Sequence, residues 1–527
     1  MSQEYDAIVI GGGHNGLVNA AYLAKAGKKT LVLERRHVLG GASVTEEVFP
    51  GFKFTVFSYV VSLFRPEIIR DLDLTRHGLT ILPLESTLSP LPDGNYLYRD
   101  ADHYRTLRAI ARFSARDADA YDDYSREMYF MAKAVKYMLG IIPPDPSGFN
   151  PFDLRELANM ARHFLGLEDE QFFTLYRLMT MSSADFLERW FESEPLKGTL
   201  SASGIIGTYL GPRSPGTAYV LLHHYMGEID GAFRAWGFSK GGTGGIAHAI
   251  ALAAQAFGAE IRTQAPVERV IVQNGRATGV VLENGDELHA RVVVSSLDPR
   301  QTFLNLVDPN QLPADLVQAI RRYNTRGSSG KVNLALDAAP DLSCMPGIGA
   351  HLKGAISISP SVDYIERAYD DAKYGDFSRK PYIDAIIPSM IDPDMAPPGK
   401  HVMSCFVQYA PYQLSHGKNW DEHREAFGDA VVDTLSEYIP NLKDIILHRQ
   451  VLTPWDMEQM VGLSQGNIFQ GELSLSQLFF LRPAAGVAKY RTPLRSYYQC
   501  GSGTHPGGGI SGAPGRLAAL EILKDWK

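Results

Sequence analysis

Residues 5–36 constrain the fold of this chain more than any other stretch, because they hold the parts of a nucleotide-binding βαβ unit in order. An apolar strand runs into the turn Gly11-x-Gly13-x-x-Gly16, a helix follows from about Asn15, and a second apolar strand comes after it. The first glycine permits the tight turn, the second admits a pyrophosphate to the backbone, and the third lets helix and strand pack closely. The helix N-terminus then offers free N–H groups to phosphates.

An acidic residue, Glu34, ends the second strand, 23 residues after Gly11. A carboxylate at this position accepts hydrogen bonds from both hydroxyls of a ribose and repels a 2′-phosphate. The unit therefore predicts a dinucleotide site that disfavours NADP.

A basic pair and a second glycine turn follow directly. Arg35 and Arg36 precede LGGAS, in which Gly40, Gly41 and Ala42 form the turn. This arrangement resembles the second glycine signature of FAD-binding proteins of the glutathione-reductase type. The resemblance implies that backbone N–H groups at Gly41 and Ala42 meet the pyrophosphate from the opposite side.

The C-terminus carries seven glycines between Gly501 and Gly515, far more than a fraying tail needs. In the two-part FAD site that the resemblance implies, a strand at 497–501 and a helix at 515–523 return to the first domain. The glycine run then passes under the ribityl chain and the flavin ring. The residues assigned to the cofactor here are Gly501, Gly508, Gly509 and Ile510.

The middle of the chain agrees with this organisation. A glycine cluster and a helix occupy 237–261, but AWGFSK before them does not read as a buried strand, so a separate NAD(P)H domain is not expected. Alternating apolar residues with turns at Asn274-Gly275 and Asn284-Gly285 then predict a β-meander. In similar proteins the position of Val267 contacts the adenine through its main chain.

With these blocks placed, the chain resembles the carotenoid/phytoene desaturase and retinol saturase family of flavoproteins. The phrases GGTGGIAHAIA, VVSSLDP and GSGTHPGGGISG are similar to those of that family. ERRHVLGGASVTEE, WFESEPLK and GTAYVLLHH are similar in particular to a sub-branch, the pyridine nucleotide-disulphide oxidoreductase domain-containing protein two group. The resemblance extends from residue 5 to about 520 and implies FAD bound without a covalent link.

We therefore predict an α/β fold with two lobes, since 527 residues exceed what one hydrophobic core organises. A discontinuous Rossmann-like FAD domain of the glutathione-reductase type is expected from 1–75, 237–300 and 480–527. An α+β substrate lobe, mostly helical in its first segment, is expected from 76–236 and 301–479.

Composition excludes several classes of function. A net charge of −8 argues against nucleic acid as a partner, because phosphate binding needs a basic face. The three cysteines form neither a CxxC pair nor zinc-type spacing, so no metal site or dithiol centre is expected, whatever the name of the sub-branch suggests. A first strand near Tyr5 leaves no room for a signal or transit peptide, and the expected location is the cytoplasm. Oligomeric state is not fixed.

The segment 128–144, MYFMAKAVKYMLGIIPP, is apolar almost all round. Such a helix either lies in a membrane surface and draws lipid-soluble substrate from it, or forms a buried wall of the second lobe. The sequence leaves both interpretations open.

Flavin-dependent desaturation needs a group that takes a proton while the flavin accepts a hydride. Histidine suits that task because its pKa lies near neutrality. The candidates are His505 in the glycine loop, and His223 and His224 on a predicted helix. For His505, a role in positioning the cofactor is favoured over acid/base catalysis. Adjacent helical residues point about 100° apart, so at most one of that pair reaches the ring.

The favoured hypothesis is an FAD-dependent oxidoreductase that oxidises, reduces or isomerises a hydrophobic, isoprenoid or lipid-like small molecule, with oxygen or a quinone as electron partner. An amine oxidase is the first alternative, in which Tyr497 and Tyr498 supply an aromatic cage beside the flavin. A regulatory protein stabilised by FAD, with little turnover, is the second.

Overall fold

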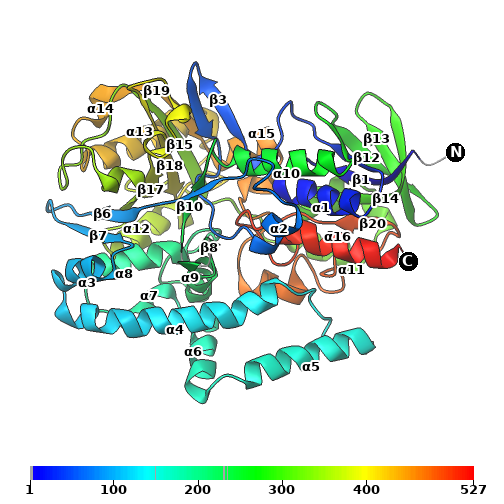
Figure 1. Ribbon diagram of the computed structural model, residues 1–527, viewed down its shortest axis with the longest axis horizontal. Helices are drawn as coiled ribbons and strands as arrows, with labels where there is room; N and C mark the ends of the chain where they lie inside the picture. The colour runs from blue at the N-terminus through cyan, green and yellow to red at the C-terminus, as the bar shows by residue number, and fades with distance from the viewer. Residues whose placement is uncertain (1–3, 149, 230–231, 234, 527) are drawn as a thin grey trace.

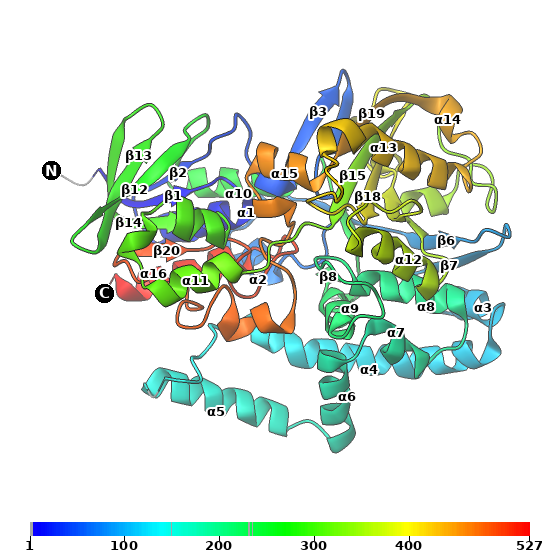
Figure 2. The ribbon, with the colours of Figure 1, turned by 180° about the vertical axis from the view of Figure 1, so that it is seen from behind.

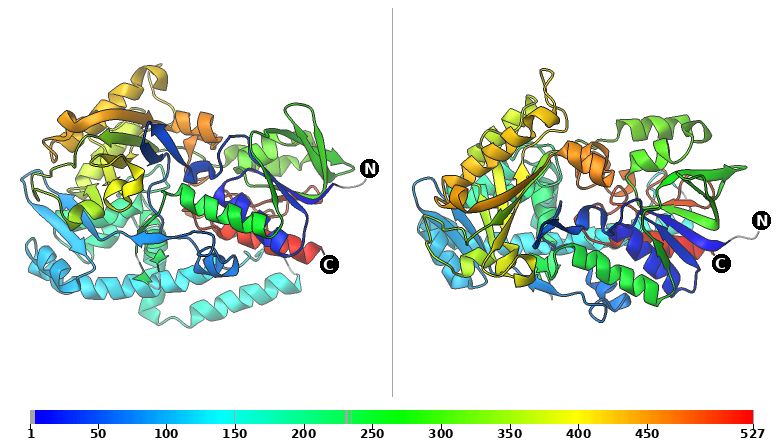
Figure 3. Two further views of the ribbon diagram at one scale, coloured as in Figure 1. Left: turned by 45° about the horizontal axis from the view of Figure 1, so that its top comes forward. Right: turned by 90° about the horizontal axis from the view of Figure 1, so that it is seen from above.

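The computed structural model describes every residue except 1–3, 149, 230–231, 234 and 527. Two seven-stranded sheets lie at opposite ends of the long axis, as the three sets of views agree (Figures 1, 2 and 3). The predicted discontinuous α/β domain surrounds one sheet, and the second lobe surrounds the other.

The first sheet has the order β11-β2-β1-β14-β13-β12, with β20 paired to β14. Its parallel part joins strands from both ends and the middle of the chain, and β12 to β14 form the predicted antiparallel meander. The strands are β1 (Tyr5–Ile10), β2 (Thr30–Leu33), β11 (Glu260–Arg262), β12 (Val267–Gln273), β13 (Arg276–Leu282), β14 (Glu287–Ser295) and β20 (Tyr497–Gln499).

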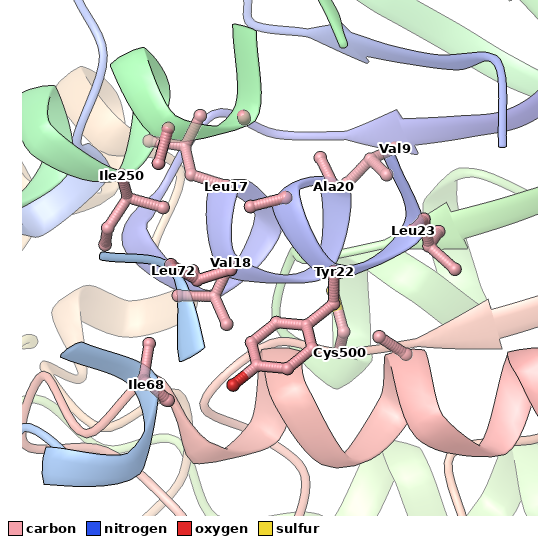
Figure 4. Close-up of a cluster of buried hydrophobic side chains, with 14 of the residues drawn as sticks. Val9, Leu17, Val18, Ala20, Tyr22, Leu23, Ile68, Leu72, Ile250 and Cys500 are labelled. Carbon is pink, nitrogen blue, oxygen red and sulfur yellow. The ribbon is translucent and has the colours of Figure 1, made fainter. Parts of the chain in front are cut away.

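Three helices cover one face of this sheet: α1 (His14–Lys25), α10 (Gly244–Ala256) and α16 (Ala513–Asp525), with the short α2 (Pro66–Asp71) beside them. Figure 4 shows Leu17 and Val18 of α1 packed toward Ile68 and Ile250. Helices α1 and α16 approach so closely that a Cβ on Gly515 would lie 2.2 Å from the carbonyl oxygen of Asn15. The last helix of the chain therefore packs directly on the first.

The opposite face is covered by α11 (Ala314–Arg322), which lies in front of the sheet in Figure 2. Phe303, Leu316 and Ile320 pack in this core with Ile8 and Val293. The sequence placed the domain boundary before them, at residue 300. Apolar spacing predicts that such residues are buried, but it does not say against which sheet.

The second sheet has the order β19-β15-β18-β17-β16-β6-β7, antiparallel except where β16 pairs with β6. Its far face packs on α13 (Trp420–Ser436) through Phe427 and Val431. The strands are β6 (Ser86–Pro90), β7 (Tyr96–Asp100), β15 (Ser329–Leu336), β16 (Ala355–Ile358), β17 (Tyr382–Ile386), β18 (His401–Gln408) and β19 (Ile446–Leu452).

Helices dominate the first segment of the second lobe, as predicted, and the lowest of them in Figure 1 form an arm made of α5 and α6. The helices are α3 (His103–Ala111), α4 (Ala115–Leu139), α5 (Pro151–Leu165), α6 (Asp169–Thr180), α7 (Ser183–Glu188), α8 (Glu194–Ser201) and α9 (Thr217–Tyr225). Later helices are α12 (Val362–Lys373), α14 (Leu442–Ile445) and α15 (Pro454–Val461).

The described residues also form three two-stranded ribbons: β3 (Thr45–Phe49) with β4 (Phe52–Thr55), β5 (Ile81–Pro83) with β10 (Gly237–Ser239), and β8 (Glu228–Ile229) with β9 (Ala232–Phe233). Strand β10 is buried, so the expectation of no strand before the glycine cluster was wrong. Because β10 pairs with β5 and not with the first sheet, it does not begin a second nucleotide-binding unit.

Candidate functional site

An open cleft of about 1550 Å³ lies at the carboxyl end of β1, where parallel sheets place their ligands. The fingerprint turn forms one wall, and the second glycine turn and the segment 265–268 form others. The sequence-predicted residues that line it are Gly11, Gly13, Asn15, Gly16, Glu34, Arg35, Arg36, Gly40, Gly41, Ala42 and Val267.

Two fingerprint glycines serve different purposes. A Cβ on Gly16 would lie 2.2 Å from the carbonyl oxygen of Gly11, so this position admits only glycine for packing reasons. A Cβ on Gly13 would meet no atom nearer than the carbonyl oxygen of Gly40 at 4.0 Å. Gly13 is bare toward the cleft, which leaves its backbone open to a ligand.

The N-terminus of α1 opens into this cleft. Gly13 is the N-cap, and in the described part of the chain no side chain caps the first turn. The free N–H groups and the positive end of the helix dipole therefore face the space between the two glycine turns, where they favour an anion.

The carboxylate of Glu34 is fixed by the backbone around it. One oxygen accepts the N–H of Gly12 at 2.7 Å and the other accepts the N–H of Arg36 at 2.9 Å. Carboxylate oxygens carry further lone pairs, so Glu34 retains acceptor capacity for ribose hydroxyls at the cleft wall.

The basic pair that follows is anchored by the protein. Arg36 donates from Nη2 to both carboxylate oxygens of Glu46, at 2.9 and 3.0 Å. Its Nη1 is buried and has no partner among the described residues. Arg35 donates to the carbonyl of Gln459 at 3.1 Å.

The C-terminal glycine loop is shaped mainly by protein atoms. A Cβ on Gly501 would lie 2.5 Å from the carbonyl oxygen of Ser296, and one on Gly508 would lie 2.4 Å from the ring of Phe469. Gly509 and Ile510 line an apolar pocket, whereas Gly508 lines a smaller cavity and Gly501 lines none of the cavities described here. Close protein packing therefore accounts for several glycines that the sequence suggested were bare for a ligand.

A buried arginine holds this loop in place. Arg482 is fully buried and donates to the carbonyl of Ser502 from both Nε and Nη2, at 3.2 and 2.8 Å. Its other acceptors are the carbonyls of Phe469, Gly471, Glu472 and Gln477. Burial lowers the pKa of this guanidinium. The side chain crosslinks two loops without a carboxylate partner in the described chain.

An apolar pocket of about 790 Å³ adjoins the cleft and shares His14, Ala42, Ile468 and Ser502 with it. Aromatic and aliphatic side chains form most of its wall: Phe57, Tyr59, Leu63, Ile206, Trp236, Phe406 and Phe469. The far end of the cleft is thus continuous with this apolar pocket, which lies between the two lobes.

A second cavity, of about 1510 Å³, opens beyond the apolar pocket. The two share Tyr59, Val60, Ile206 and Trp236. Tyr59 stacks on Phe406 with ring centroids 5.5 Å apart, and its hydroxyl donates to Asp384 at 2.7 Å. This cavity is more polar than the pocket that leads to it.

The three candidate histidines occupy different environments. His224 lines the apolar pocket, donates from Nδ1 to the carbonyl of Val220 at 2.9 Å, and stacks on Trp236. His223 lines the smaller cavity with both ring nitrogens lacking a partner in the described structure. His505 lines none of these cavities; its Nε2 donates to the carbonyl of Met138 at 2.9 Å.

All three rings are neutral at physiological pH. Burial lowers the pKa of His224 to about 4 and of His505 to about 3. Burial, followed by the charges of His224 and Arg482, lowers the pKa of His223 to about 3. Of the three, only His224 is placed to meet a molecule in the apolar pocket.

Sequence reasoning missed His14, the variable residue inside the fingerprint. It lines both the cleft and the apolar pocket, and its Nδ1 lies 3.1 Å from the Ser43 hydroxyl. Its Nε2 is buried without a partner among the described residues, and burial lowers its pKa to about 4. A neutral imidazole thus sits at the junction of the two spaces.

Lys331, Tyr59 and Asp384 were also missed, because each is isolated in sequence. The one available signal lies in 329–336, where Lys331 and Asn333 alternate with apolar residues in a strand that is wholly buried. Tyr497 and Tyr498, expected as an aromatic cage, instead lie on β20 in the two cores of the first sheet. Their hydroxyls donate to the Thr302 carbonyl and to Asp525.

The family model described as flavin containing amine oxidoreductase matches residues 16–523. The chain is 42% identical to pyridine nucleotide-disulfide oxidoreductase domain-containing protein 2 of Rattus norvegicus, over all of this chain and 94% of the relative. It is 26% identical to a limonene dehydrogenase polypeptide of Castellaniella defragrans, over 99% and 95%. It is 26% identical to prolycopene isomerase of Daucus carota, over 86% and 70%.

Solved structures show the same fold. A putrescine oxidase bound to putrescine superposes with a TM-score of 0.61 at 16% identity, covering 99% of this chain and 98% of that one. An oxidoreductase from Methanosarcina mazei gives 0.60 at 17% identity, over 98% and 100%.

The cofactor these comparisons indicate is FAD, and the cleft fits it. The bare N-terminus of α1, the open backbone at Gly13 and the unpartnered Nη1 of Arg36 suit a pyrophosphate. Glu34 suits the ribose, and the end of the apolar pocket that Ala42, Ser502 and Gly509 line suits a flat aromatic ring system. The other end, lined by Tyr59, Ile206 and Trp236, opens toward the second cavity.

Proposed function

The chain belongs to the flavin-containing amine oxidoreductase family, and from that premise we propose that this flavoenzyme acts on an apolar, isoprenoid or lipid-like substrate. The observation that carries the proposal is the aromatic and aliphatic pocket continuous with the cofactor cleft. The names of two relatives support it, since limonene and prolycopene are isoprenoid hydrocarbons.

Bound FAD supplies a hydride acceptor or donor. The residues around the apolar pocket bury the substrate, orient it by shape and exclude water. We propose His224 as the side chain that meets the substrate, because it lines the pocket and stacks against Trp236. Its neutral ring suits proton transfer or simple packing, and the pH profile of a His224→Gln variant separates these roles. Oxygen or a quinone is the electron partner that we propose.

An amine oxidase is the second candidate. It is favoured by the family name and by the likeness to putrescine oxidase. The pair Tyr497 and Tyr498 no longer supports it, because both rings are buried in the first domain. Trp236, Tyr59 and Phe406 still provide aromatic walls near the cofactor cleft.

Anaerobic visible spectroscopy of the FAD-loaded protein tests the proposal. Limonene, a linear isoprenoid and a native lipid extract are compared with putrescine and benzylamine. Bleaching by an isoprenoid or lipid, and not by the amines, is the expected result. Bleaching by amines alone would refute the proposal and show that the protein is an amine oxidase. Readmission of oxygen or a quinone then identifies the electron acceptor from the rate at which colour returns.

A matched pair of variants tests whether the pocket is the site of that bleaching. Ile206 lines the pocket and the second cavity, so Ile206→Trp fills the passage between them. Leu252 lies on α10 with 38% of its surface exposed, so Leu252→Trp adds the same ring outside the site. We expect Ile206→Trp to slow bleaching at least tenfold at unchanged FAD content, and Leu252→Trp to leave it unchanged.

We also propose that helix α4 and the arm formed by α5 and α6 contact a membrane surface. In segment 128–144, Met128, Met131 and Val135 pack in the lobe core, whereas Tyr129 and Phe130 are exposed. Helix α6 adds exposed Phe172, Phe173 and Tyr176. Within the described parts of the chain, no helix has both the length and the apolar character needed to cross a bilayer. Cosedimentation with liposomes that falls in Phe172→Ser/Phe173→Ser would support contact; no cosedimentation would refute it.

A further inference from the structure

The face of the second sheet that looks toward the site carries buried polar groups. Lys331 and Asn333, both fully buried, alternate with Val332 and Leu334 on β15, and the half-buried Asp384 lies between Ile383 and Ala385 on β17. Burying polar groups is unfavourable unless they find partners. A substrate that is a pure hydrocarbon could not form hydrogen bonds with ionisable side chains such as Lys331 and Asp384.

Asp384 differs from the other acids of the second cavity. Asp100 pairs with Arg105 at 2.8 Å, and Glu85 lies 3.6 Å from Lys353, so a neighbouring cation neutralises each. Among the described residues, no basic nitrogen lies within 4.0 Å of the Asp384 carboxylate. Its one hydrogen-bond donor in that set is the Tyr59 hydroxyl, at 2.7 Å. A carboxylate offers about four lone-pair sites, so acceptor capacity remains.

Lys331 is a buried cation whose charge acts on Asp384, but its ammonium is hydrogen-bonded elsewhere. Its ammonium donates to the carbonyl of Ser58 at 3.1 Å and lies 5.0 Å from the centroid of the Tyr59 ring. Burial lowers the pKa of Lys331 to about 7. Burial raises the pKa of Asp384 to about 6, against the lowering effects of Tyr59 and Lys331. The carboxylate is thus mainly ionised at neutral pH.

Tyr59 links the polar group to the apolar pocket. Its ring lines both spaces and stacks on Phe406, while Trp236 lines the same junction. A molecule extending from the apolar pocket along these rings reaches Asp384 in the second cavity.

We propose that Asp384 and Tyr59 form a subsite for a hydrogen-bond-donating end group, a hydroxyl or an ammonium, on a substrate whose apolar body lies in the neighbouring pocket. The apolar body rests on the proposed function; the polar end is new. A carboxylate accepts from both groups and repels an anionic end, so carboxylate-terminated molecules should bind more weakly.

A matched terpenoid series tests this subsite by calorimetric titration of the FAD-loaded protein at pH 7.5. Myrcene, geraniol, geranylamine and geranate share a ten-carbon body and differ in the end group. We expect geraniol and geranylamine to bind about tenfold or more tightly than myrcene, and geranate to bind most weakly. Asp384→Asn keeps the shape and removes the charge, and should abolish most of the geranylamine preference. Tyr59→Phe should reduce it less.

Asp100→Asn is the control, because Asp100 lines the same cavity but is paired with Arg105. It should change these affinities less than about twofold. Equal affinity for the four compounds, a preference for geranate, no binding at all, or an Asp384→Asn variant that matches the wild type would each overturn the subsite. Binding is read without turnover. If the end-group preference holds and no isoprenoid bleaches the flavin, the proposed function fails and the subsite stands. If an isoprenoid bleaches the flavin but the end group does not affect binding, the subsite fails and the proposed function stands.

Discussion

The side-chain amide of Asn15 donates a hydrogen bond to the hydroxyl of Ser502 at 3.0 Å, across 487 residues of sequence. Both residues line the cofactor cleft. The bond ties the first turn of α1 to the loop that precedes α16, so the two ends of the chain share one wall of the site.

We expect Ser502→Ala and Asn15→Ala each to weaken FAD binding about tenfold, because either change frees the loop from the fingerprint helix. The double variant should lose less FAD binding free energy than the sum of the losses in the two single variants. We expect the difference, which is the coupling energy, to be about 1 kcal/mol. Fluorescence titration of the apoprotein with FAD measures this. Ser476→Ala, at an exposed hydroxyl pair, is the control and should bind normally. Strict additivity would show that the hydrogen bond does not couple the two ends.

Gly13→Ala and Gly16→Ala should separate ligand access from packing. A methyl group at Gly13 meets no protein atom nearer than 4.0 Å, so the apoprotein should keep its stability while FAD affinity falls about a hundredfold. At Gly16 the methyl group would lie 2.2 Å from a backbone oxygen, so both stability and FAD binding should fall, the former by about 1 to 3 kcal/mol. Thermal unfolding with and without FAD distinguishes the cases. Equal loss of apoprotein stability in both variants would contradict the assignment.

Arg482→Lys should destabilise the protein strongly although it keeps the charge. The guanidinium reaches the carbonyls of Ser502 and four other residues, and an ammonium has only three donors on a flexible stem. We expect the free energy of unfolding to fall by about 3 kcal/mol, measured by chemical denaturation. Arg495→Lys, whose exposed side chain donates to the carbonyl of Asn274, should change it little.

Stability should depend on pH through Asp384. Its pKa in the folded protein, about 6, lies above the ordinary value, so its stabilising contribution is complete below about pH 4 and is lost as the pH rises through 6. Asp384→Asn removes that loss, so relative to the wild type the variant should gain about 1 to 3 kcal/mol between pH 4.5 and 7. The titratable neighbours are Tyr59, Lys331, Tyr382 and Cys405.

Lys331 acts in the opposite sense, because its pKa is lowered to about 7 and its contribution is lost as the pH falls through that value. Lys331→Met in the Asp384→Asn background separates the two groups. Melting curves across the pH range provide the measurement. A wild-type minus Asp384→Asn difference that does not vary with pH would exclude a shifted Asp384.

The cofactor half of the molecule was predictable from sequence because its residues lie in contiguous motifs. Each task at the cleft is done by a short segment, such as the turn at Gly13 or the acid at Glu34, whose spacing alone fixes its geometry. The strand at 497–501 was also found, but the side chains on it were misassigned. Pairing with β14 places β20 inside the sheet, so Tyr497 and Tyr498 enter the cores on its two faces.

The substrate half was not predictable in this way. Tyr59, Trp236 and Asp384 come from three distant segments, and each looks like an ordinary core or loop residue when read alone. These three residues come together only because the strands of the second sheet pair in this order and the sheet packs against the two-stranded ribbons. The polar alternation at Lys331 and Asn333 was a usable sign, since a wholly buried strand rarely carries such residues without a purpose.

The position of α16 has a consequence for how this protein is made. Ribosomes synthesise a chain from its N-terminus, so the residues around Ser502 and Gly515 that contact α1 emerge long after the fingerprint does. The cofactor cleft therefore stays incomplete on the nascent chain until α16 has been synthesised. A premature stop codon before α16 would remove the helix that packs on α1, so we expect the truncated polypeptide to bind FAD more weakly. Such a product would be a natural target for quality-control proteases.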